Sequence, residues 1–272
     1  MFRRSVARLS PVVLGFVGFL FLAGCAGDNE DFYLEQPVEQ LYNRAMELMA
    51  DGSYAQAARF FLEVERQHPY SVWATKAQLM SAFAYYQYNQ YSDAIPALDR
   101  FIQLHPGHKD VAYAYYLKAL CYYEQIADVA RDQSATNEAV KALQQVIDRF
   151  PTSRYAGDAK LKIDLSRDHL AGKEMNIGRW YEKQHLYLAA INRYRTVVDN
   201  YQTTTHVPEA LHRLDECYEA LGLGDEAKKV AAVLGYNYPG SPWYADIYNL
   251  VTGAHRPAVG DDSSWYDFNW LF

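Results

Sequence analysis

The chain has 272 residues, a formal net charge of −7 and 24 tyrosines, against 15 glycines and 10 prolines. The acidic balance argues against a nucleic-acid partner and against a basic surface that would bind anionic lipid. The aromatic-rich, glycine-poor composition is typical of a packed and mostly helical protein, and it argues against a disordered or β-rich chain.

The N-terminus carries positive charges, then an apolar run, then a cysteine. Arg3, Arg4 and Arg8 precede the apolar residues 11–24, and small residues lead up to Cys25 in the sequence FLAGC. The run is shorter than the roughly 20 residues that a membrane-spanning helix needs. This layout predicts a signal peptide over residues 1–24 that is removed on export. The polar residues 25–36 then predict a tether.

Amphipathic segments that end on the same kind of residue, usually a proline, recur along the rest of the chain; we call this residue the closing residue. Four of them close on a proline, and one further copy has Gln202 at that position; the prolines are Pro69, Pro106, Pro151 and Pro239. Upstream of each closing residue, a small residue is followed at four and seven positions by residues that would share its helix face. These triplets are Ala57–Phe61–Val64, Ala94–Leu98–Phe101, Ala139–Leu143–Val146, Ala190–Tyr194–Val197 and Ala227–Ala231–Leu234.

Another helix, which would be the first helix of each repeat, is predicted on the N-terminal side of each triplet. Its small positions are Ala45, Ala82, Ala119 and Gly178, with Asp215 at the matching position of the fifth copy; three residues later come Leu48, Tyr85, Tyr122, Tyr181 and Tyr218. Small residues let paired helices approach closely, and the larger residue fills the space beside them. The pattern resembles the tetratricopeptide repeat, in which two antiparallel helices form each unit.

The spacing between the third and fourth triplets is the longest, and the additional sequence has helical periodicity at Tyr155, Ala159 and Ile163. The fold class predicted is therefore all-α: an α-solenoid of five tetratricopeptide-type helix pairs with an extra helix between repeats three and four. Residues 37–151 would form repeats one to three, residues 152–245 the extra helix and repeats four and five, and residues 246–272 an aromatic tail.

Catalytic and metal-binding patterns are not found in the sequence. There is no HExxH, GxSxG, Walker-type glycine loop or CxxC pair. His105 and His108 lie in a closing turn without a third ligand nearby in sequence, so a loop is a better interpretation than a metal site. The sequence therefore predicts no enzyme activity, no metal and no cofactor. Cys121 and Cys217 fall in apolar helical stretches and are expected as buried thiols, although a mutual disulfide stays open in an oxidising compartment.

A binding role has more support, because a helical solenoid leaves a concave face open to a partner. Tyrosines at the repeat-core positions are expected to pack inside the repeats. Side chains outside that frame are the better candidates for contact with an extended peptide, since aromatic rings supply area at low entropic cost. The candidates are Tyr70, Trp73, Tyr86, Tyr88 and Arg100.

The tail has its own pattern. WYDFNWLF packs five aromatic residues into eight, with Phe268, Trp270 and Phe272 alternating. The alternation resembles the closing strand of outer-membrane β-barrels. The interpretation favoured is that these rings dock on the last helices and cap the solenoid. A sharper hypothesis is that the tail imitates a substrate and occupies a partner's groove.

Three stretches carry a more specific resemblance: LDRFIQLHP at 98–106, FPTSRYAGDAK at 150–160 and AAINRYRTVV at 189–198. With the FLAGC lipobox and five repeats, the chain resembles the BamD family, the tetratricopeptide-repeat lipoproteins of the outer-membrane β-barrel assembly machinery. The resemblance implies a non-enzymatic scaffold that docks on the POTRA domains of BamA, works with other Bam lipoproteins, and helps receive and insert unfolded β-barrel precursors.

The family's functional positions map onto this chain as follows. The NR pair that helps hold BamA corresponds to Asn192 and Arg193, and a position associated with substrate recognition corresponds to Arg100. Gln103 and His68 stand where the family has an arginine and a tyrosine. An arginine at such a position can bind a partner carboxylate through two parallel hydrogen bonds.

The resemblance also implies a location. Cys25 would carry the lipid and become the mature N-terminus, and several acyl chains suffice for stable anchoring. Ala26 follows it, rather than the aspartate that retains lipoproteins in the inner membrane of many enterobacteria. The expected location is the periplasmic face of the outer membrane. Two alternatives remain: a different repeat-containing envelope lipoprotein, of the pilotin or cell-division coordinator type, or an envelope enzyme mounted on repeats.

Overall fold

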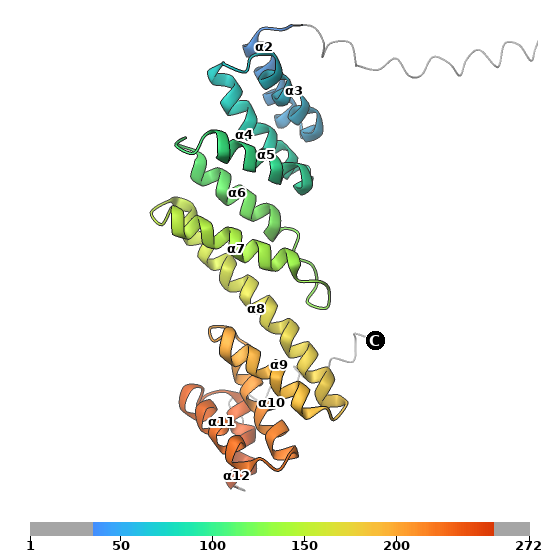
Figure 1. Ribbon diagram of the computed structural model, residues 1–272, viewed down its shortest axis with the longest axis vertical. Coiled ribbons are helices and arrows are strands. Elements are labelled where there is room, and N and C mark those ends of the chain that lie inside the picture. The colour runs from blue at the N-terminus through green and yellow to red at the C-terminus, as the bar shows by residue number, and fades with distance from the viewer. Residues whose placement is uncertain (1–34, 253–272) are drawn as a thin grey trace, which may run out of the picture.

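The structure, a computed structural model, describes residues 35–252, and it describes side chains as far as residue 247. Within that range the chain forms helices and no strand. The helices are α2 (Val38–Ala50), α3 (Tyr54–Gln67), α4 (Val72–Gln87), α5 (Tyr91–Leu104), α6 (Val111–Tyr123), α7 (Ser134–Arg149), α8 (Arg154–Lys183), α9 (Tyr187–Asn200), α10 (Val207–Ala220), α11 (Gly224–Asn237) and α12 (Pro242–Thr252). They stack as successive antiparallel pairs into an elongated rod (Figure 1). The predicted all-α repeat solenoid is confirmed.

The two helices of a repeat are joined by the same three-residue turn in four of the five repeats. Its middle residue has a left-handed backbone each time, with φ of +75° at Gly52, +60° at Asn89, +58° at His185 and +74° at Gly222. This conformation ends a helix because the N–H groups of the turn residues donate back to carbonyls in the last turn of the helix. Glycine adopts it without strain and asparagine tolerates it, so Gly52, Gly222 and Asn89 suit these turns. Repeat three instead has a longer loop over residues 124–133.

The closing turns between repeats are also alike. The residue before each closing position has φ between −133° and −126° and ψ between 42° and 57°; these residues are His68, His105, Phe150, Tyr201 and Tyr238. A following proline disfavours the helical region for the residue before it, so the helix stops there. The copy with Gln202 keeps the same geometry, because the backbone N–H of Thr204 donates to the Tyr201 carbonyl at 3.0 Å as in the other turns.

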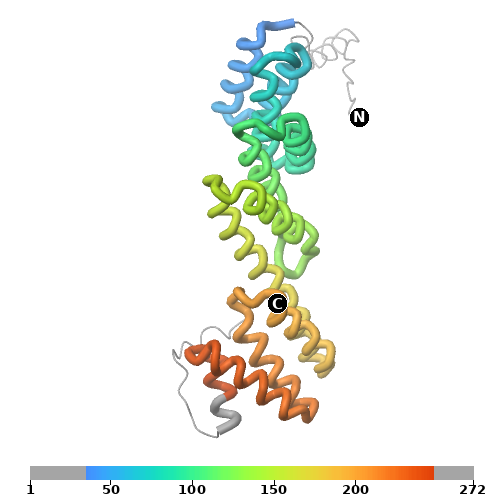
Figure 2. The backbone as a smooth tube through the Cα atoms, turned by 60° about the vertical axis from the view of Figure 1, so that its left-hand side comes forward, coloured from blue at the N-terminus to red at the C-terminus, as the bar shows by residue number. Residues whose placement is uncertain are grey.

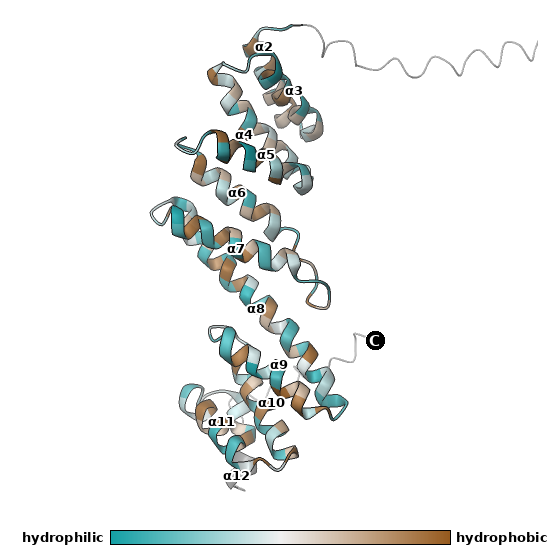
Figure 3. Cartoon of the chain, in the orientation of Figure 1, coloured by the Kyte–Doolittle hydropathy of each residue, from teal (hydrophilic) through white to brown (hydrophobic). Residues whose placement is uncertain are grey.

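Buried side chains form four successive hydrophobic clusters along the rod. They lie among α2–α4, among α4–α6, among α6–α8 and among α8–α12. The repeat triplets supply their centres: every triplet residue is buried except Ala231, which is partly buried. Burying a large apolar side chain contributes about 1.5–3 kcal/mol each. Figure 3 shows hydrophobic and hydrophilic residues on the same helices, as expected for helices that bury one side.

The first helices of the repeats lie closer together than the second helices. Helix α4 packs on α2, α6 on α4, and α8 on α6, whereas within the described residues no second helix packs comparably on the next second helix. The first helices α2, α4, α6 and α8 therefore form the inner face of the N-terminal repeats. The second helices α3, α5 and α7 form the outer face.

The helix predicted between repeats three and four is present, but it is not a separate element. Helix α8 continues unbroken for 30 residues into the first helix of repeat four. Ala159 and Ile163 belong to the cluster with α6 and α7, whereas Ala171 and Met175 belong to the C-terminal cluster. No proline interrupts this stretch, so the backbone hydrogen bonds run through. The single helix joins an N-terminal block (α2 to the first half of α8) to a C-terminal block (the second half of α8 to α12), as Figure 2 shows.

Two turns meet at the middle of α8. Lys173 Nζ donates to the carbonyl of Ala130, in the loop after α6, at 2.7 Å. Thr205, in the turn before α10, donates to Asp168 through its backbone N–H at 3.0 Å and its hydroxyl at 2.9 Å. These contacts border an open pocket whose lining includes His169 and His206. They brace α8 where the two blocks join.

Helix α12 extends the fold beyond the fifth repeat. The sequence places the start of the tail at residue 246, but the helix that begins at Pro242 continues to Thr252. Ala245 and Ile247 are buried, and Trp243 and Tyr244 pack against the C-terminal cluster. The segment after the fifth closing turn is thus a capping helix, because those apolar residues cover the open side of the last repeat.

Candidate partner-binding surfaces

Tyrosines from three successive first helices lie beside one another on the inner face of the N-terminal block. Tyr86 belongs to α4, Tyr113 and Tyr116 to α6, and Tyr155 to the start of α8. The rings of Tyr116 and Tyr155 are stacked with centroids 4.9 Å apart, and those of Tyr113 and Tyr155 are 5.6 Å apart. We call these four residues the inner aromatic row. It offers a half-buried aromatic surface of the kind that favours protein contacts.

Three phenols of the inner aromatic row, those of Tyr86, Tyr113 and Tyr116, stay protonated at physiological pH. Burial raises the pKa of Tyr86 and of Tyr113 to about 12. Burial also raises the pKa of Tyr116, which donates a hydrogen bond to Asp158. Neutral hydroxyls of this kind donate to and accept from a peptide backbone.

Only Tyr86 of this row could be picked out as a binding candidate from the sequence. Tyr113, Tyr116 and Tyr155 were missed as candidates, although Tyr113 and Tyr116 are three residues apart and so share a helix face. Their meeting with Tyr86 depends on the packing of α4, α6 and α8, which no local pattern reveals.

Arg100 projects from the second helix α5 and pairs with Glu65 of α3. Its second guanidinium nitrogen also approaches Glu65, at 3.5 Å from Oε2. Glu65 accepts a further hydrogen bond from Gln78 Nε2 at 2.7 Å, so the carboxylate is held from two helices. The Arg100 side chain is 60% exposed. Its substrate role stays a prediction, and the structure places it on an outer-face helix rather than within the inner aromatic row.

The remaining N-terminal candidates do not gather into one site. Tyr70 is fully exposed in the turn before α4, and Trp73 is partly buried against Tyr42, with ring centroids 4.7 Å apart. Tyr88 is exposed just after the other end of α4. A helix of this length spans about 24 Å at 1.5 Å per residue. Tyr70 and Trp73 thus lie at one end of α4, and Tyr86 and Tyr88 at the other.

Arg193 and Asn192 lie on α9, the second helix of repeat four. Asn192 is exposed, and the Arg193 side chain is 42% exposed. Arg193 Nη1 donates to Glu174 Oε2 of α8 at 3.1 Å. That bond restricts the side chain before any partner arrives. A guanidinium has five N–H donors, so one bond within the chain still allows a partner carboxylate to bind.

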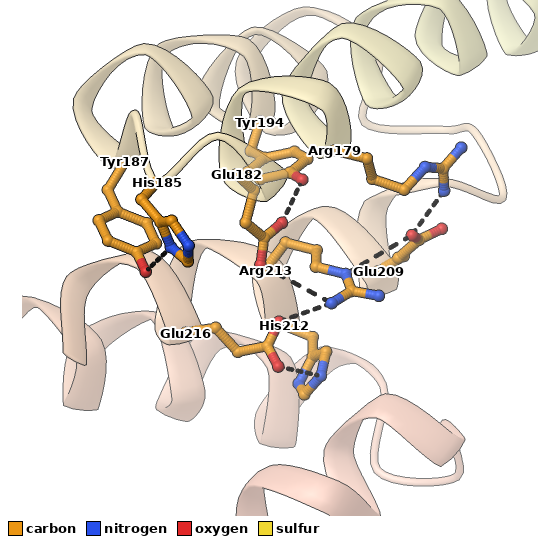
Figure 4. Close-up of polar contacts among 9 residues, drawn as sticks. All are labelled: Arg179, Glu182, His185, Tyr187, Tyr194, Glu209, His212, Arg213 and Glu216. Carbon is orange, nitrogen blue, oxygen red and sulfur yellow. Dashed lines mark hydrogen bonds and ion pairs between the residues drawn. The ribbon is translucent and has the colours of Figure 1, made fainter. Parts of the chain in front are cut away.

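The helix that carries Arg193 is fixed by a polar cluster beneath it (Figure 4). Tyr194, the next residue, donates its hydroxyl to Glu182 of α8 at 2.6 Å. Arg213 of α10 lies 3.7 Å from Glu182 and 2.9 Å from Glu216. We call the following residues the C-terminal polar cluster: Arg179, Glu182, Tyr194, Glu209, His212, Arg213 and Glu216. It links α8, α9 and α10, so the position of Arg193 is set by three helices.

Burial shifts the pKa values of several groups in the C-terminal polar cluster. Burial raises the pKa of Glu182, against the opposing effects of the Tyr194 hydroxyl and Arg213. Burial and the bond to Glu182 likewise raise the pKa of Tyr194, which therefore keeps its proton and donates. Burial lowers the pKa of His212. The hydrogen bonds and ion pairs among these groups brace the three helices, a structural role.

The two cysteines inside the repeats are free thiols and buried, as expected. Cys121 lies in the cluster among α4–α6 and Cys217 in the cluster among α8–α12, so the fold keeps them apart. Burial raises the pKa of each thiol to about 12. Thiols with so little thiolate are poor nucleophiles and poor ligands.

Several predicted features lie outside the described residues: the signal peptide, the Cys25 lipid site, most of the tether and the aromatic residues 265–272. In the part of the chain that is described, no helix has the length and apolar character needed to cross a membrane. Across the same residues, no group of three or more His, Cys, Asp or Glu side chains is arranged to hold a metal ion.

A family model described as "YfiO: Outer membrane lipoprotein" matches residues 34–234. A protein of Caulobacter vibrioides named outer membrane protein assembly factor BamD is 52% identical over 88% of this chain and 79% of its own. A protein of the same name from Rickettsia prowazekii is 49% identical over 85% of this chain and 92% of its own. The tetratricopeptide domain of P58(IPK) aligns with a TM-score of 0.41 at 13% identity, covering 79% of this chain and 56% of that one.

Proposed function

Because this chain belongs to the BamD family of outer membrane lipoproteins, we propose that it is a non-enzymatic scaffold for the assembly of outer-membrane proteins. The name shared by the relatives favours this role over a pilotin, a cell-division coordinator or an enzyme mounted on repeats. The proposed partners are the POTRA domains of BamA, other Bam lipoproteins and unfolded β-barrel precursors.

The proposed docking surface for the POTRA domains is the exposed side of α9 around Arg193 and Asn192. The observation that carries it is the restrained guanidinium: Glu174 holds Arg193 from α8, and Tyr194 anchors the same helix turn through Glu182. A preorganised arginine loses less conformational entropy when it binds a carboxylate, so its contribution to affinity is larger.

The proposed surface for precursors is the N-terminal block. The inner aromatic row supplies rings and neutral hydroxyls for extended, unfolded chains, and Arg100 supplies an exposed positive charge on α5. Unfolded barrel precursors present alternating aromatic and polar residues. Rings and hydroxyls at fixed positions suit such segments without demanding one sequence.

The proposed anchor is a covalent lipid on Cys25 that holds the protein at the periplasmic face of the outer membrane. Its support is the FLAGC sequence after a short apolar run, together with the lipoprotein description of the family. The tether over residues 25–36 would keep the first repeat near the bilayer. Mass spectrometry of the purified chain tests for acyl groups on Cys25; an unmodified Cys25 would contradict the anchor.

The docking surface is tested with Arg193→Glu. We expect the barrel-forming subunit to be recovered at least several-fold less with this variant, in pull-downs from detergent-solubilised envelopes, because a carboxylate would meet the partner's carboxylate. Arg195→Glu is the matched control: Arg195 lies on the same helix, and its only ion pair given by the structure is a long one to Asp199, at 4.0 Å.

A second variant separates lost docking from lost folding. Arg193→Glu leaves Glu174 beside a like charge, so Glu174→Arg combined with Arg193→Glu restores the internal pair with reversed polarity. We expect the double variant to recover the thermal stability of the original chain and still to lose the barrel subunit. Full recovery of the subunit by either variant would rule out this surface.

A further inference from the structure

Five large apolar side chains stand exposed on one edge of the C-terminal block. They come from the turns that join the helices within repeats four and five, and from the helix ends next to one of those turns. Leu188 is 68% exposed in the first turn of α9, and Trp180 is 57% exposed in the last turn of α8. We call the set the apolar turn edge: Trp180, Leu186, Leu188, Leu221 and Leu223. Exposed apolar residues that cluster in this way mark interaction sites.

The described chain ends level with this edge. Helix α11 runs antiparallel to α10, and α12 runs back along α11, so α12 points the same way as α10. Trp243 of α12 lies against His212 of α10, with ring centroids 5.1 Å apart. Nine residues further on in each helix, about 13.5 Å at 1.5 Å per residue, come Thr252 and Leu221. The chain therefore leaves α12 on the same side of the C-terminal block as Leu221.

The chain beyond Thr252 has the composition and the length to cover that edge. Residues 265–272 hold five aromatic side chains, and twelve residues, 253–264, connect them to α12. Such a connection spans up to about 40 Å when extended. Neighbouring packed helices lie only about 8–10 Å apart, so the edge is well within reach.

Charge favours contact at the α8–α9 end of the edge, whereas Asp225 and Glu226 lie just after Leu223 at the other end. The segment 253–272 contains Asp261, Asp262 and Asp267 against a single arginine. Lys183 is the exposed last residue of α8 and lies between Trp180 and Leu186 in the sequence. An acidic aromatic segment that binds there would place its carboxylates near this cation.

We propose that residues 265–272 bind the apolar turn edge of their own chain and cover Leu188 and Leu221. The segment then covers exposed apolar side chains that would otherwise contact other molecules. This proposal does not depend on the assembly function, because it concerns only contacts within the chain.

The proposal is tested by photo-crosslinking in the full chain, purified in detergent. Benzoylphenylalanine replaces Leu188, and after irradiation the crosslinked peptides are identified by mass spectrometry. Leu161 and Tyr236 are the control positions: both are exposed, by 64% and 87%, and both lie away from the edge. We expect Leu188 to crosslink to peptides from residues 265–272, and the two controls to give several-fold less of that product.

Each other outcome contradicts the proposal. Crosslinks to the segment that are equally strong at Tyr236 or Leu161 would mean that it has no preferred site. Mixing isotopically labelled and unlabelled chains identifies crosslinks between two copies, and if only those are found, the segment serves association rather than its own chain. No crosslink from Leu188 to the segment would also overturn it.

Proteolysis gives an independent measurement. In the variant Leu188→Ser the segment should lose cover, so we expect cleavage after the aromatic residues 265–272 to become several-fold faster. Leu161→Ser, a change of the same kind on the N-terminal half of α8, should leave the rate unchanged. Equal cleavage rates in both variants would contradict the proposal.

Discussion

Asp215 occupies a position that the other repeats give to alanine or glycine. Small residues occupy the equivalent position in the other repeats and let paired helices approach: Ala45, Ala82, Ala119 and Gly178. Asp215 is also buried. Burial raises the pKa of the Asp215 carboxyl to about 6, and the nearby Glu219 and Glu216 add to the effect. Repeat five therefore carries a carboxylate where a small apolar residue would pack without charge.

The pH dependence of stability should reveal this cost. Well below pH 3.8 the carboxyl is protonated in both states and costs nothing. As the pH rises from 3.8 to about 6 the unfolded chain ionises first, so stability falls, and well above pH 6 the loss is constant. We expect Asp215→Asn to unfold with a free energy higher by about 1–3 kcal/mol at pH 7.5. Chemical denaturation at pH 4 should show a much smaller gain. A gain that does not change with pH would contradict the assignment.

Helix α8 depends on a glycine at its contact with α9. A Cβ added to Gly178 would lie 2.8 Å from Tyr194 Cδ1, and Tyr194 is fully buried. The ring cannot move aside without leaving the C-terminal cluster and its bond to Glu182. Close approach at Gly178 therefore outweighs the roughly 1 kcal/mol by which glycine weakens a helix interior.

A matched pair of substitutions separates the two effects. We expect Gly178→Ala to lower the free energy of unfolding by about 1–3 kcal/mol, because overpacking displaces Tyr194. Gly157→Ala, in the same helix with nothing within 4 Å of the added Cβ, should be stabilising by up to about 1 kcal/mol. Thermal and chemical denaturation measure both, and opposite signs are the prediction. A stabilising Gly178→Ala would show that Tyr194 can yield.

At the scale of the whole molecule, the contacts that stabilise the fold are arranged in succession along the solenoid axis. The four hydrophobic clusters follow one another, and each repeat packs mainly on its neighbours. The two blocks share α8 and the contacts at its middle, where Lys173 and Asp168 bind neighbouring turns. In such an array a local defect weakens its own cluster first.

Two cavities of the same kind, one in each block, test this. Leu234→Ala in α11 and Leu98→Ala in α5 each remove a fully buried side chain and should cost about 2–5 kcal/mol locally. We expect hydrogen exchange in Leu234→Ala to speed up over α9–α12 and to stay unchanged over α2–α5, with the reverse pattern in Leu98→Ala. Uniform loss of protection along the whole chain would show one cooperative unit instead.

The repeat register could be determined from the sequence by itself. The prolines, the left-handed turn residues and the buried triplets act locally, so their spacing predicts helix pairs without knowledge of the rest. The same is true of the family resemblance, which the comparisons confirm. Family membership likewise directed attention to Arg193 and Arg100, whose partner contacts stay predictions.

Only the tertiary structure decided which side chains meet. Tyr113, Tyr116 and Tyr155 lie together, and Glu174 and Glu65 hold the two arginines, through contacts between residues 19 to 42 apart in the sequence. Such contacts arise from the angle and spacing at which helices pack, a property of the assembled solenoid rather than of any one segment. The sequence alone therefore determined the elements, and their packing decided the surfaces.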